Sequence, residues 1–333
     1  MDLDVSDVRQ QAATGLIPPE GEIMAALRGA YERALEHHEG QVADYIPALA
    51  RADHEAFDLV VVDVKGNSYQ QQGSGASFTI QSISKAFVYA LVCERLGHER
   101  ALELVGVNNT GLPFNSVIAL ELNHGHPMNP MVNAGALSTT SLVPGDNPTS
   151  QWEFILAGLS GFAGHQLTVD EEVFQSEMAT NQRNMAIARL LQSYDRLDGD
   201  PDQVVEVYTR QCSVQVTAAD LAVMGATLAD GGVNPITKQR VVSAEVARDT
   251  LAVMAASGLY ENSGLWLFDI GLPGKSGVAG GLVTVAPGKG GIGCYGPALD
   301  SAGNSVRGQI ATAYLSRSLG LNIFASNPRP EGA

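Results

Sequence analysis

Ser82-Ile83-Ser84-Lys85 is a short segment whose two outer side chains could act together as a nucleophile and its base. Helical periodicity begins here, and residues i and i+3 of a helix share a face, so the Ser82 hydroxyl and the Lys85 amine can meet. Partial burial and nearby dipoles would lower the lysine pKa, so that the neutral amine could take the serine proton. N–H groups at the helix start would stabilise an oxyanion. Taken alone, the S-x-x-K pattern more often arises by chance, as an exposed lysine on a capped helix. Ser84 is the other candidate nucleophile, but on a helix it would point away from the amine.

A second segment, Lys275-Ser276-Gly277, is followed by Val278-Ala279-Gly280-Gly281. Serine acyl-transfer enzymes that use S-x-x-K carry a downstream K-T-G, of which this is the serine variant. We predict a strand that borders the cleft, where the glycines let a substrate approach the backbone and a strand N–H could supply an oxyanion donor. A glycine-rich turn is the plain alternative, but the two motifs together favour acyl transfer.

Other motif-like strings fail on their surroundings. A phosphate loop needs glycine six residues before Lys275, where the chain has Asp269. The G-x-G-x-x-G string at 291–296 is followed by Pro297, where a dinucleotide-binding helix would have to begin. His124-Gly125-His126 has no carboxylate or thiol at ligand spacing. We therefore predict no metal site and no nucleotide site.

The composition is that of a globular protein with few basic residues. The 333 residues are 45% hydrophobic and carry a formal net charge of −16, with no run of Lys or Arg. This disfavours binding to nucleic acid and to anionic membranes, and acidity of this size helps solubility. The acidic start is unlike a signal peptide, no apolar stretch reaches the roughly 18 residues of a membrane helix, and the three cysteines show no paired spacing. We expect a cytoplasmic protein with reduced thiols.

The periodicity places strands near both ends of the chain and helices between them. A helix is predicted from Ile23 to near Gly40, and helical spacing returns from Ser82 to about residue 260. Predicted strands cover 59–64, a partner through 70, 265–270, 282–285 and 291–295, and a last helix covers 306–319. The predicted start signals are a capping box at 168–171, Asp200-Pro201, Thr217 and Ser243, and the stop signals are Gly97, Gly231 and Gly258.

That order of elements predicts the architecture. A lone N-terminal hairpin is marginal in water, and its only available partners lie at the far end of the chain. We predict an α+β fold with one antiparallel sheet built from both ends and covered by the terminal helices. Residues 1–80 and 220–333 would form this discontinuous sheet region, and 81–219 a helical region. An active cleft is expected between the two, where pockets commonly form.

Several segments together resemble the serine-dependent glutaminase family of bacteria and mitochondria. They occur in the family's order between Tyr45 and Val278, and they are Asp44–Pro47, Gln81–Lys85, Asn129–Ala136, Ser176-Glu177, Arg183–Ala186, Tyr208–Ser213, Gly258–Tyr260 and Lys275–Val278. The resemblance implies a β-lactamase/transpeptidase-like fold and the hydrolysis of L-glutamine to L-glutamate and ammonia, without a metal or an organic cofactor. It also implies a homo-oligomer, either a dimer or a tetramer.

The resemblance assigns roles to single residues. Ser82 matches the family's nucleophile, Lys85 its activating partner and Tyr260 a proton-shuttling tyrosine. The matches to substrate-binding positions are Tyr45, Asn133, Glu177, Asn184, Tyr208 and, through its main chain, Val278. A carboxylate such as Glu177 suits the substrate ammonium, and neutral donors suit its carboxylate. Each residue alone also has an ordinary packing or capping explanation. The sequence departs from the family pattern at Asn181, where glycine is usual, and at Ala279 in a glycine run.

Two other functions fit parts of the pattern. A β-lactamase-like or penicillin-interacting serine hydrolase would share the fold, but its middle S-D-N segment is missing from the chain. A catalytically inactive amino-acid-binding module would share the pocket, but the chain retains both Ser82 and Lys85. The sequence therefore favours a glutaminase that acts through an acyl-enzyme on Ser82.

Overall fold

The two ends of the chain meet in one antiparallel sheet. In the computed structural model, which describes residues 4, 5, 7–9, 11 and 17–326, the strand order is β2-β1-β7-β6-β5. β1 (Asp58–Asp63) and β2 (Ser68–Gln72) form the N-terminal hairpin, and β1 pairs with β7 so that Asp58 faces Tyr295. The C-terminal part supplies β5 (Gly274–Ser276), β6 (Gly281–Ala286) and β7 (Gly290–Tyr295). The prediction of a sheet from both chain ends is confirmed.

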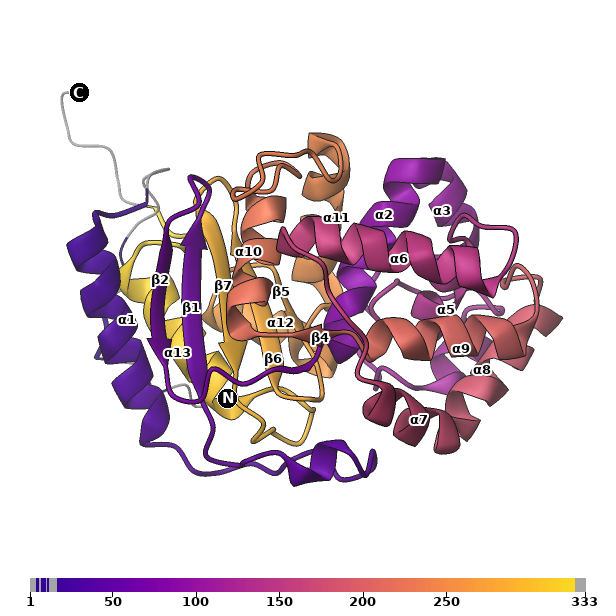
Figure 1. The fold of residues 1–333 in the computed structure, drawn as a ribbon, viewed down its shortest axis with the longest axis horizontal. Helices are drawn as coiled ribbons and strands as arrows, with labels where there is room; N and C mark the ends of the chain where they lie inside the picture. Colours follow the sequence, from indigo (N-terminus) through magenta and orange to yellow (C-terminus); the bar gives the residue numbers. More distant parts are fainter. Residues whose placement is uncertain (1–3, 6, 10, 12–16, 327–333) are drawn as a thin grey trace.

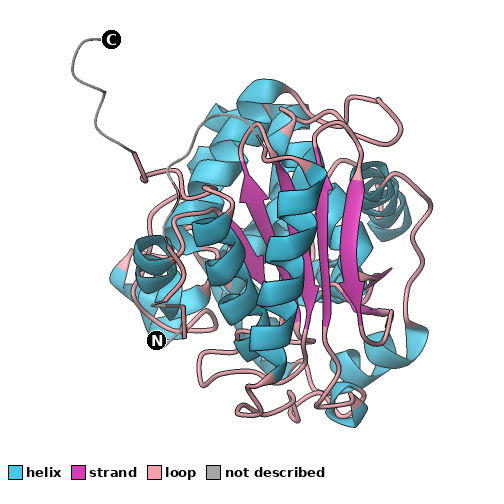
Figure 2. Ribbon diagram, turned by 90° about the vertical axis from the view of Figure 1, so that its left-hand side faces the viewer, coloured by secondary structure: helices cyan, strands magenta, loops and turns pink. Residues whose placement is uncertain are grey.

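Alternate residues of β1 point into two separate cores. Leu59 and Val61 pack with α1 (Glu20–Leu35) and α13 (Val306–Ser318), as the terminal helices were expected to do (Figure 1). Figure 2 looks onto the sheet from this side, with helices in front of the strands. Val60 and Val62 point the other way, into the core that contains α10 (Ala218–Ala229). This alternation is the period of a strand buried on both faces.

β7 is rich in glycine because α10 lies directly on its backbone. A Cβ atom at Gly291 would lie 2.3 Å from the Ala222 carbonyl oxygen, and one at Gly293 would lie 2.0 Å from the Ala218 carbonyl oxygen. Side chains at these two positions would push the helix away from the sheet. The glycine string that resembled a nucleotide-binding motif therefore serves helix–sheet packing.

Most of the remaining helices lie beside the sheet, on the right in Figure 1. The central one is α2 (Ser84–Leu96), which is buried from Ser84 to Cys93. The others are α3 (His98–Leu104), α4 (Val117–Leu122), α5 (Asn133–Ser141), α6 (Pro148–Ala163), α7 (Glu171–Ala179), α8 (Gln182–Ser193), α9 (Pro201–Cys212), α11 (Ala244–Ser257) and α12 (Ser263–Asp269). Short 3₁₀ turns cover Leu49–Arg51, Gln81–Ile83 and Tyr260–Asn262, and β3 (Phe78–Thr79) pairs with β4 (Gln215–Val216). The division of the chain into a sheet region and a helical region, with boundaries at residues 80 and 219, stays a prediction. Residues 1–3 and 327–333 of the predicted sheet region lie outside the described residues.

The segment 265–270 is helical, so the strand predicted there is wrong. It lies in α12, where Trp266 is buried and its indole N–H donates to the Leu272 carbonyl oxygen at 2.7 Å, while Phe268 is 83% exposed. A short apolar run fits a strand or a helix equally well, and periodicity in so few residues does not decide between them. The predicted first helix also stops early, at Leu35 rather than near Gly40.

Most of the predicted helix boundaries are confirmed, with two corrections. Asp200, Thr217 and Ser243 accept hydrogen bonds from the first turns of α9, α10 and α11, and Gly97 and Gly231 have positive φ angles of 83° and 60°. The capping box at 168–171 is wrong, because Asp170 caps α7 and the Thr168 hydroxyl contacts Gln215 instead. Gly258 has a φ of −76° and is not a left-handed stop. Its Cβ would lie 1.8 Å from the Gly274 carbonyl oxygen, so close packing explains the glycine.

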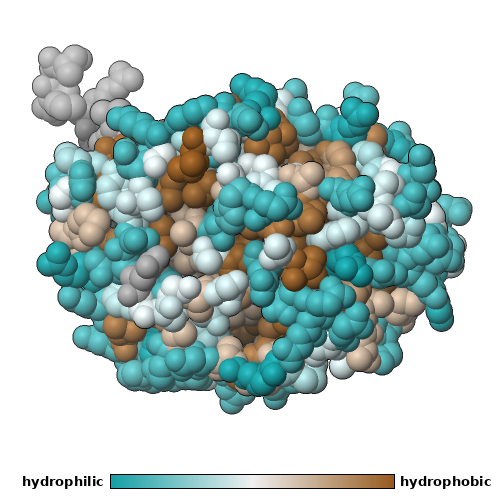
Figure 3. Space-filling view, viewed as in Figure 1, coloured by the Kyte–Doolittle hydropathy of each residue, from teal (hydrophilic) through white to brown (hydrophobic). Residues whose placement is uncertain are grey.

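The surface and the thiols agree with the composition. Hydrophobic residues form separate patches between hydrophilic ones on the face drawn in Figure 3. All three cysteines are free and buried. Among the described residues, the helices are too short or too polar to cross a lipid bilayer.

Candidate active site

Ser82 lies in the 3₁₀ turn that connects β3 to α2. The pairing of β3 with β4 and the hydrogen bond from the Ile80 N–H to the Val214 carbonyl oxygen, at 2.8 Å, fix the entry to this turn. Gln81 has a positive φ of 50°, which turns the chain sharply just before Ser82. Ser82 is only 7% exposed, yet it lines a cavity of about 250 Å³.

The cavity brings together predicted residues from distant parts of the chain. Tyr45 comes from the loop before β1, Asn133 from the start of α5, Glu177 from α7, Asn184 from α8, Tyr208 from α9 and Val278 from the loop after β5. Tyr45 is 56% exposed, which places it at the mouth, whereas Glu177 and Tyr208 are buried. The predicted substrate positions and Ser82 therefore share one cavity.

The Lys85 amine is buried next to this cavity and is held there by two hydrogen bonds. It donates hydrogen bonds to the Asn133 Oδ1 at 2.6 Å and to the Met131 carbonyl oxygen at 3.2 Å. Its nitrogen also lies 5.7 Å from the centre of the Phe114 ring and 6.0 Å from that of Tyr208. The direct contact between Lys85 and Ser82 stays a prediction, but the amine is tied to a residue that lines the same cavity as Ser82.

Burial shifts the pKa values of Glu177 and Lys85 toward neutral pH. It raises the pKa of Glu177 to about 7, although a hydrogen bond from Gln81 at 3.4 Å and the charge of Lys85 act in the opposite direction. Burial also lowers the pKa of Lys85 to about 8. A neutral lysine and an ionised glutamate are therefore both accessible under mildly alkaline conditions.

Tyr260 stands beside Ser82 and is oriented by the second motif. Its hydroxyl donates to the Ser276 carbonyl oxygen at 3.2 Å, and the buried Lys275 amine donates to the same oxygen at 2.8 Å. The Lys275 nitrogen lies 4.4 Å from the centre of the Tyr260 ring. Burial raises the pKa of Tyr260 well above its ordinary value, and a hydrogen bond from Ser82 only partly offsets this. Tyr260 is therefore a neutral phenol that can donate a proton.

Among the cavity-lining residues that were not predicted as site residues, Gln81 and Phe114 contact predicted ones. Gln81 contacts Glu177 with its side-chain amide, and the Phe114 ring packs against that of Tyr260 with ring centres 4.7 Å apart and an angle of 39° between the ring planes. The position of Gln81 next to Ser82 was a usable signal. Phe114 lies in an irregular loop, and nothing local in the sequence indicates that the loop folds over the cavity.

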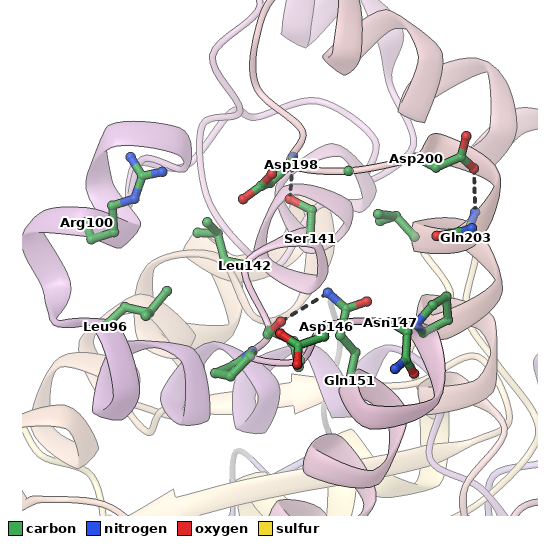
Figure 4. Close-up of a pocket in the computed structure, with 16 residues that line it drawn as sticks. Leu96, Arg100, Ser141, Leu142, Asp146, Asn147, Gln151, Asp198, Asp200 and Gln203 are labelled. Atoms are coloured by element: carbon green, nitrogen blue, oxygen red, sulfur yellow. Dashed lines mark hydrogen bonds between the residues drawn. The ribbon is translucent and has the colours of Figure 1, made fainter.

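A second hollow of about 480 Å³ contains none of the predicted residues. It lies between the ends of α2 and α5 and the starts of α6 and α9, and Figure 4 shows Arg100, Asp146 and Asp198 around it. The Asp198 N–H donates to the Ser141 hydroxyl, and Asp200 caps α9, so several of its polar groups already have structural partners. Across the described part of the chain, no group of three or more His, Cys, Asp or Glu side chains is arranged to hold a metal ion.

The comparisons with known proteins agree on one family. The family model described as Glutaminase matches residues 40–324. Glutaminase 2 of Yersinia pestis is 51% identical over 319 residues, which cover 96% of this chain and 94% of the relative. A glutaminase of Colwellia psychrerythraea is 48% identical, with 92% of this chain and 99% of the relative covered. The solved structure of a probable glutaminase, ybaS, superimposes with a TM-score of 0.91 at 44% identity and covers 93% of this chain and all of that one (100%).

Proposed function

Because this chain belongs to the glutaminase family, and is an amidohydrolase with the family's β-lactamase-like fold, we propose that it hydrolyses L-glutamine through an acyl-enzyme on Ser82. One observation supports this most strongly. A buried serine, a carboxylate and several neutral amide or phenol groups converge on one cavity of about 250 Å³, next to a buried amine. A free amino acid has an ammonium, a carboxylate and a reactive amide that such a set can address.

Substrate binding divides between charged and neutral partners. Glu177 would pair with the substrate ammonium as a carboxylate. Asn133 and Asn184 would donate side-chain N–H groups to the substrate carboxylate, together with the hydroxyls of Tyr45 and Tyr208. Hydrogen bonds to charged groups are the strong ones, especially in a buried site. Tyr45, at the exposed mouth, would close over the bound amino acid.

The first chemical step forms an ester. The neutral Lys85 amine takes the Ser82 proton, and the Ser82 oxygen attacks the side-chain amide carbon of glutamine. Backbone N–H groups of Ser82 and Val278 would stabilise the resulting oxyanion. The carbon–nitrogen bond then breaks as the Tyr260 phenol protonates the leaving nitrogen, and ammonia departs. The proton held by Lys85 passes to Tyr260.

The second step returns the enzyme to its starting state. Water loses a proton to the neutral Lys85 amine and attacks the glutamyl ester carbon. The ester carbon–oxygen bond breaks, Ser82 regains a proton, and L-glutamate leaves. No metal and no organic cofactor enters this sequence of steps, because the serine supplies the nucleophile and the phenol and amine move the protons.

The neighbouring serine provides a matched control for the nucleophile. We expect Ser82→Ala to lower the rate of ammonia release from glutamine by several powers of ten, since only binding and oxyanion stabilisation remain. Ser84→Ala should retain activity, because the Ser84 hydroxyl donates to the Gln81 carbonyl oxygen at 2.7 Å and lies outside the cavity lining. Parental activity in Ser82→Ala, or loss in Ser84→Ala alone, would contradict the assignment.

We further propose that the enzyme works in the cytoplasm as a homo-oligomer, a dimer or a tetramer. Three free, buried thiols suit a reducing compartment. The net charge of −16 disfavours nucleic acid as a partner. The proposed ligand is the substrate, L-glutamine. Exposed apolar side chains on α12 and after α13, among them Phe268 and Phe324, offer a surface for self-association.

A further inference from the structure

Asn181 stands at the N-terminal end of α8 but does not cap it. Asparagine at this position ordinarily accepts a hydrogen bond from the first helical turn, which stabilises the helix start. In this chain the side chain makes no such bond and turns inward, and the residue is only 6% exposed. Its Nδ2 donates to the Thr209 hydroxyl of α9 at 2.6 Å, and its Oδ1 accepts from the Asn184 Nδ2 at 2.6 Å. The side chain lines the cavity itself and connects α9 to Asn184, a second residue of the cavity lining.

The connection continues through the cavity to the buried amine. The Asn184 Oδ1 accepts from the Asn133 Nδ2 at 2.9 Å, and the Asn133 Oδ1 accepts from the Lys85 amine at 2.6 Å. At the other end, the Thr209 hydroxyl donates to the Val205 carbonyl oxygen at 2.8 Å. Every donor points the same way, from Lys85 toward Val205. We call this the amide chain, and it consists of Lys85, Asn133, Asn184, Asn181 and Thr209.

This directionality fixes which way each amide faces. The Asn184 and Asn133 side chains each use one N–H in the amide chain, which leaves the other for a ligand. If Asn181 no longer accepted from Asn184, the Asn184 amide could rotate and present its oxygen where the chain now has a donor. A substrate carboxylate would then meet an acceptor instead of a donor, and buried polar groups without partners are costly.

We propose that Asn181 is a positioning residue, which holds the amides of Asn184 and Asn133 in the orientation that binds the substrate carboxylate. The proposal rests on the proposed function, because it takes Asn133 and Asn184 as substrate ligands. Thr209 acts one step further away, since it orients Asn181 and does not line the cavity.

The test measures KM and kcat for glutamine in variants that interrupt the amide chain, at Asn181, which lines the cavity, and at Thr209, which does not. Asn181→Leu, of similar volume, and Thr209→Val should each raise KM about tenfold while kcat changes less than about threefold. Thr209→Ser keeps the hydroxyl and should restore the parental KM. Asn147→Ala is the stability control, because Asn147 caps α6 and lies outside the cavity lining. It should lower the melting temperature and leave KM unchanged.

A double variant separates positioning from general damage. Because Thr209→Val acts through Asn181, it should raise KM no further in an Asn181→Leu background, whereas independent effects would multiply. A parental KM in both single variants, multiplying effects in the double variant, or no rescue by Thr209→Ser would each overturn the proposal. These readings use the parental glutaminase activity, so they stay valid even if Ser82→Ala shows that another residue is the nucleophile.

Discussion

Burial of single side chains sets the protonation chemistry of the site. Glu177 and Lys85 occupy the same buried region, and loss of water moves their pKa values toward each other, to about 7 and about 8. The form of each group that the mechanism needs is its deprotonated form, a carboxylate for Glu177 and a neutral amine for Lys85. Both requirements are met at pH values above the two pKa values and fail below them.

The activity should therefore rise with pH. On logarithmic axes, kcat/KM should climb with a slope of about two below the Glu177 pKa and flatten above the Lys85 pKa, since both groups must lose a proton. Glu177→Gln should reduce the slope to about one, because only Lys85 still titrates, and should raise KM with the fold intact. Initial rates of ammonia release across pH, with circular dichroism of the variant, check both points. A flat parental profile, or an unchanged KM in Glu177→Gln, would contradict the roles of these two residues.

At the scale of elements, the position of α10 is set by the absence of side chains on β7. The helix lies within van der Waals distance of the strand backbone at Gly291 and Gly293. Any side chain at these two positions would overlap the helix backbone. Such close packing fixes the distance between the sheet and α10.

Replacement of one of these glycines should destabilise the fold. Gly293→Ala places a methyl group 2.0 Å from the Ala218 carbonyl oxygen, and overpacking of this kind costs about 1–3 kcal/mol or more of unfolding free energy. Gly264→Ala is the matched control, since a Cβ atom there meets nothing within 4 Å and the residue lies in α12. It should be neutral or stabilise by about 0.4–1 kcal/mol. Urea unfolding of both variants measures the difference, and equal midpoints would contradict the packing argument.

At the scale of the whole molecule, exposed apolar side chains gather on α12 and on the segment that follows α13. Leu265 and Phe268 on α12 are 39% and 83% exposed, and Ile323 and Phe324 after α13 are 44% and 65% exposed. The Ile323 N–H donates to the Gly271 carbonyl oxygen at 3.0 Å, which brings the two segments together. We call these four residues the terminal patch.

The terminal patch provides a test of the proposed homo-oligomer. Phe268→Asp places a charge on its most exposed residue and should shift the protein toward monomer, because burying an unpaired carboxylate in an apolar interface is unfavourable. Leu122→Asp, on α4 and 74% exposed in the parent, is the control and should leave the mass unchanged. Light scattering after size exclusion gives the masses. If Phe268→Asp keeps the parental mass, the terminal patch is not the contact.

The sequence predicted the parts of the molecule that depend on local hydrophobic patterns or on short sequence motifs. The strands near 59–64, 282–285 and 291–295 followed from apolar runs between turns, and their pairing followed because a hairpin needs partners. The segment 265–270 was assigned wrongly because its burial depends on Trp266 packing, which periodicity in a short run does not report. The amide chain was beyond reach for the same reason, since Asn181 and Thr209 meet only through the tertiary arrangement of α8 and α9.

The pairing of β1 with β7 has a consequence for synthesis of the chain. Asp58 faces Tyr295 across the sheet, so the N-terminal hairpin leaves the ribosome long before its partner strand is made. Until then the apolar faces of β1 stay uncovered, and contacts between residues so distant in sequence form slowly. The cavity next to Ser82, which takes Ser82 from one side of this gap and Val278 from the other, cannot be complete in a nascent chain. Activity therefore begins only once the last strands have emerged.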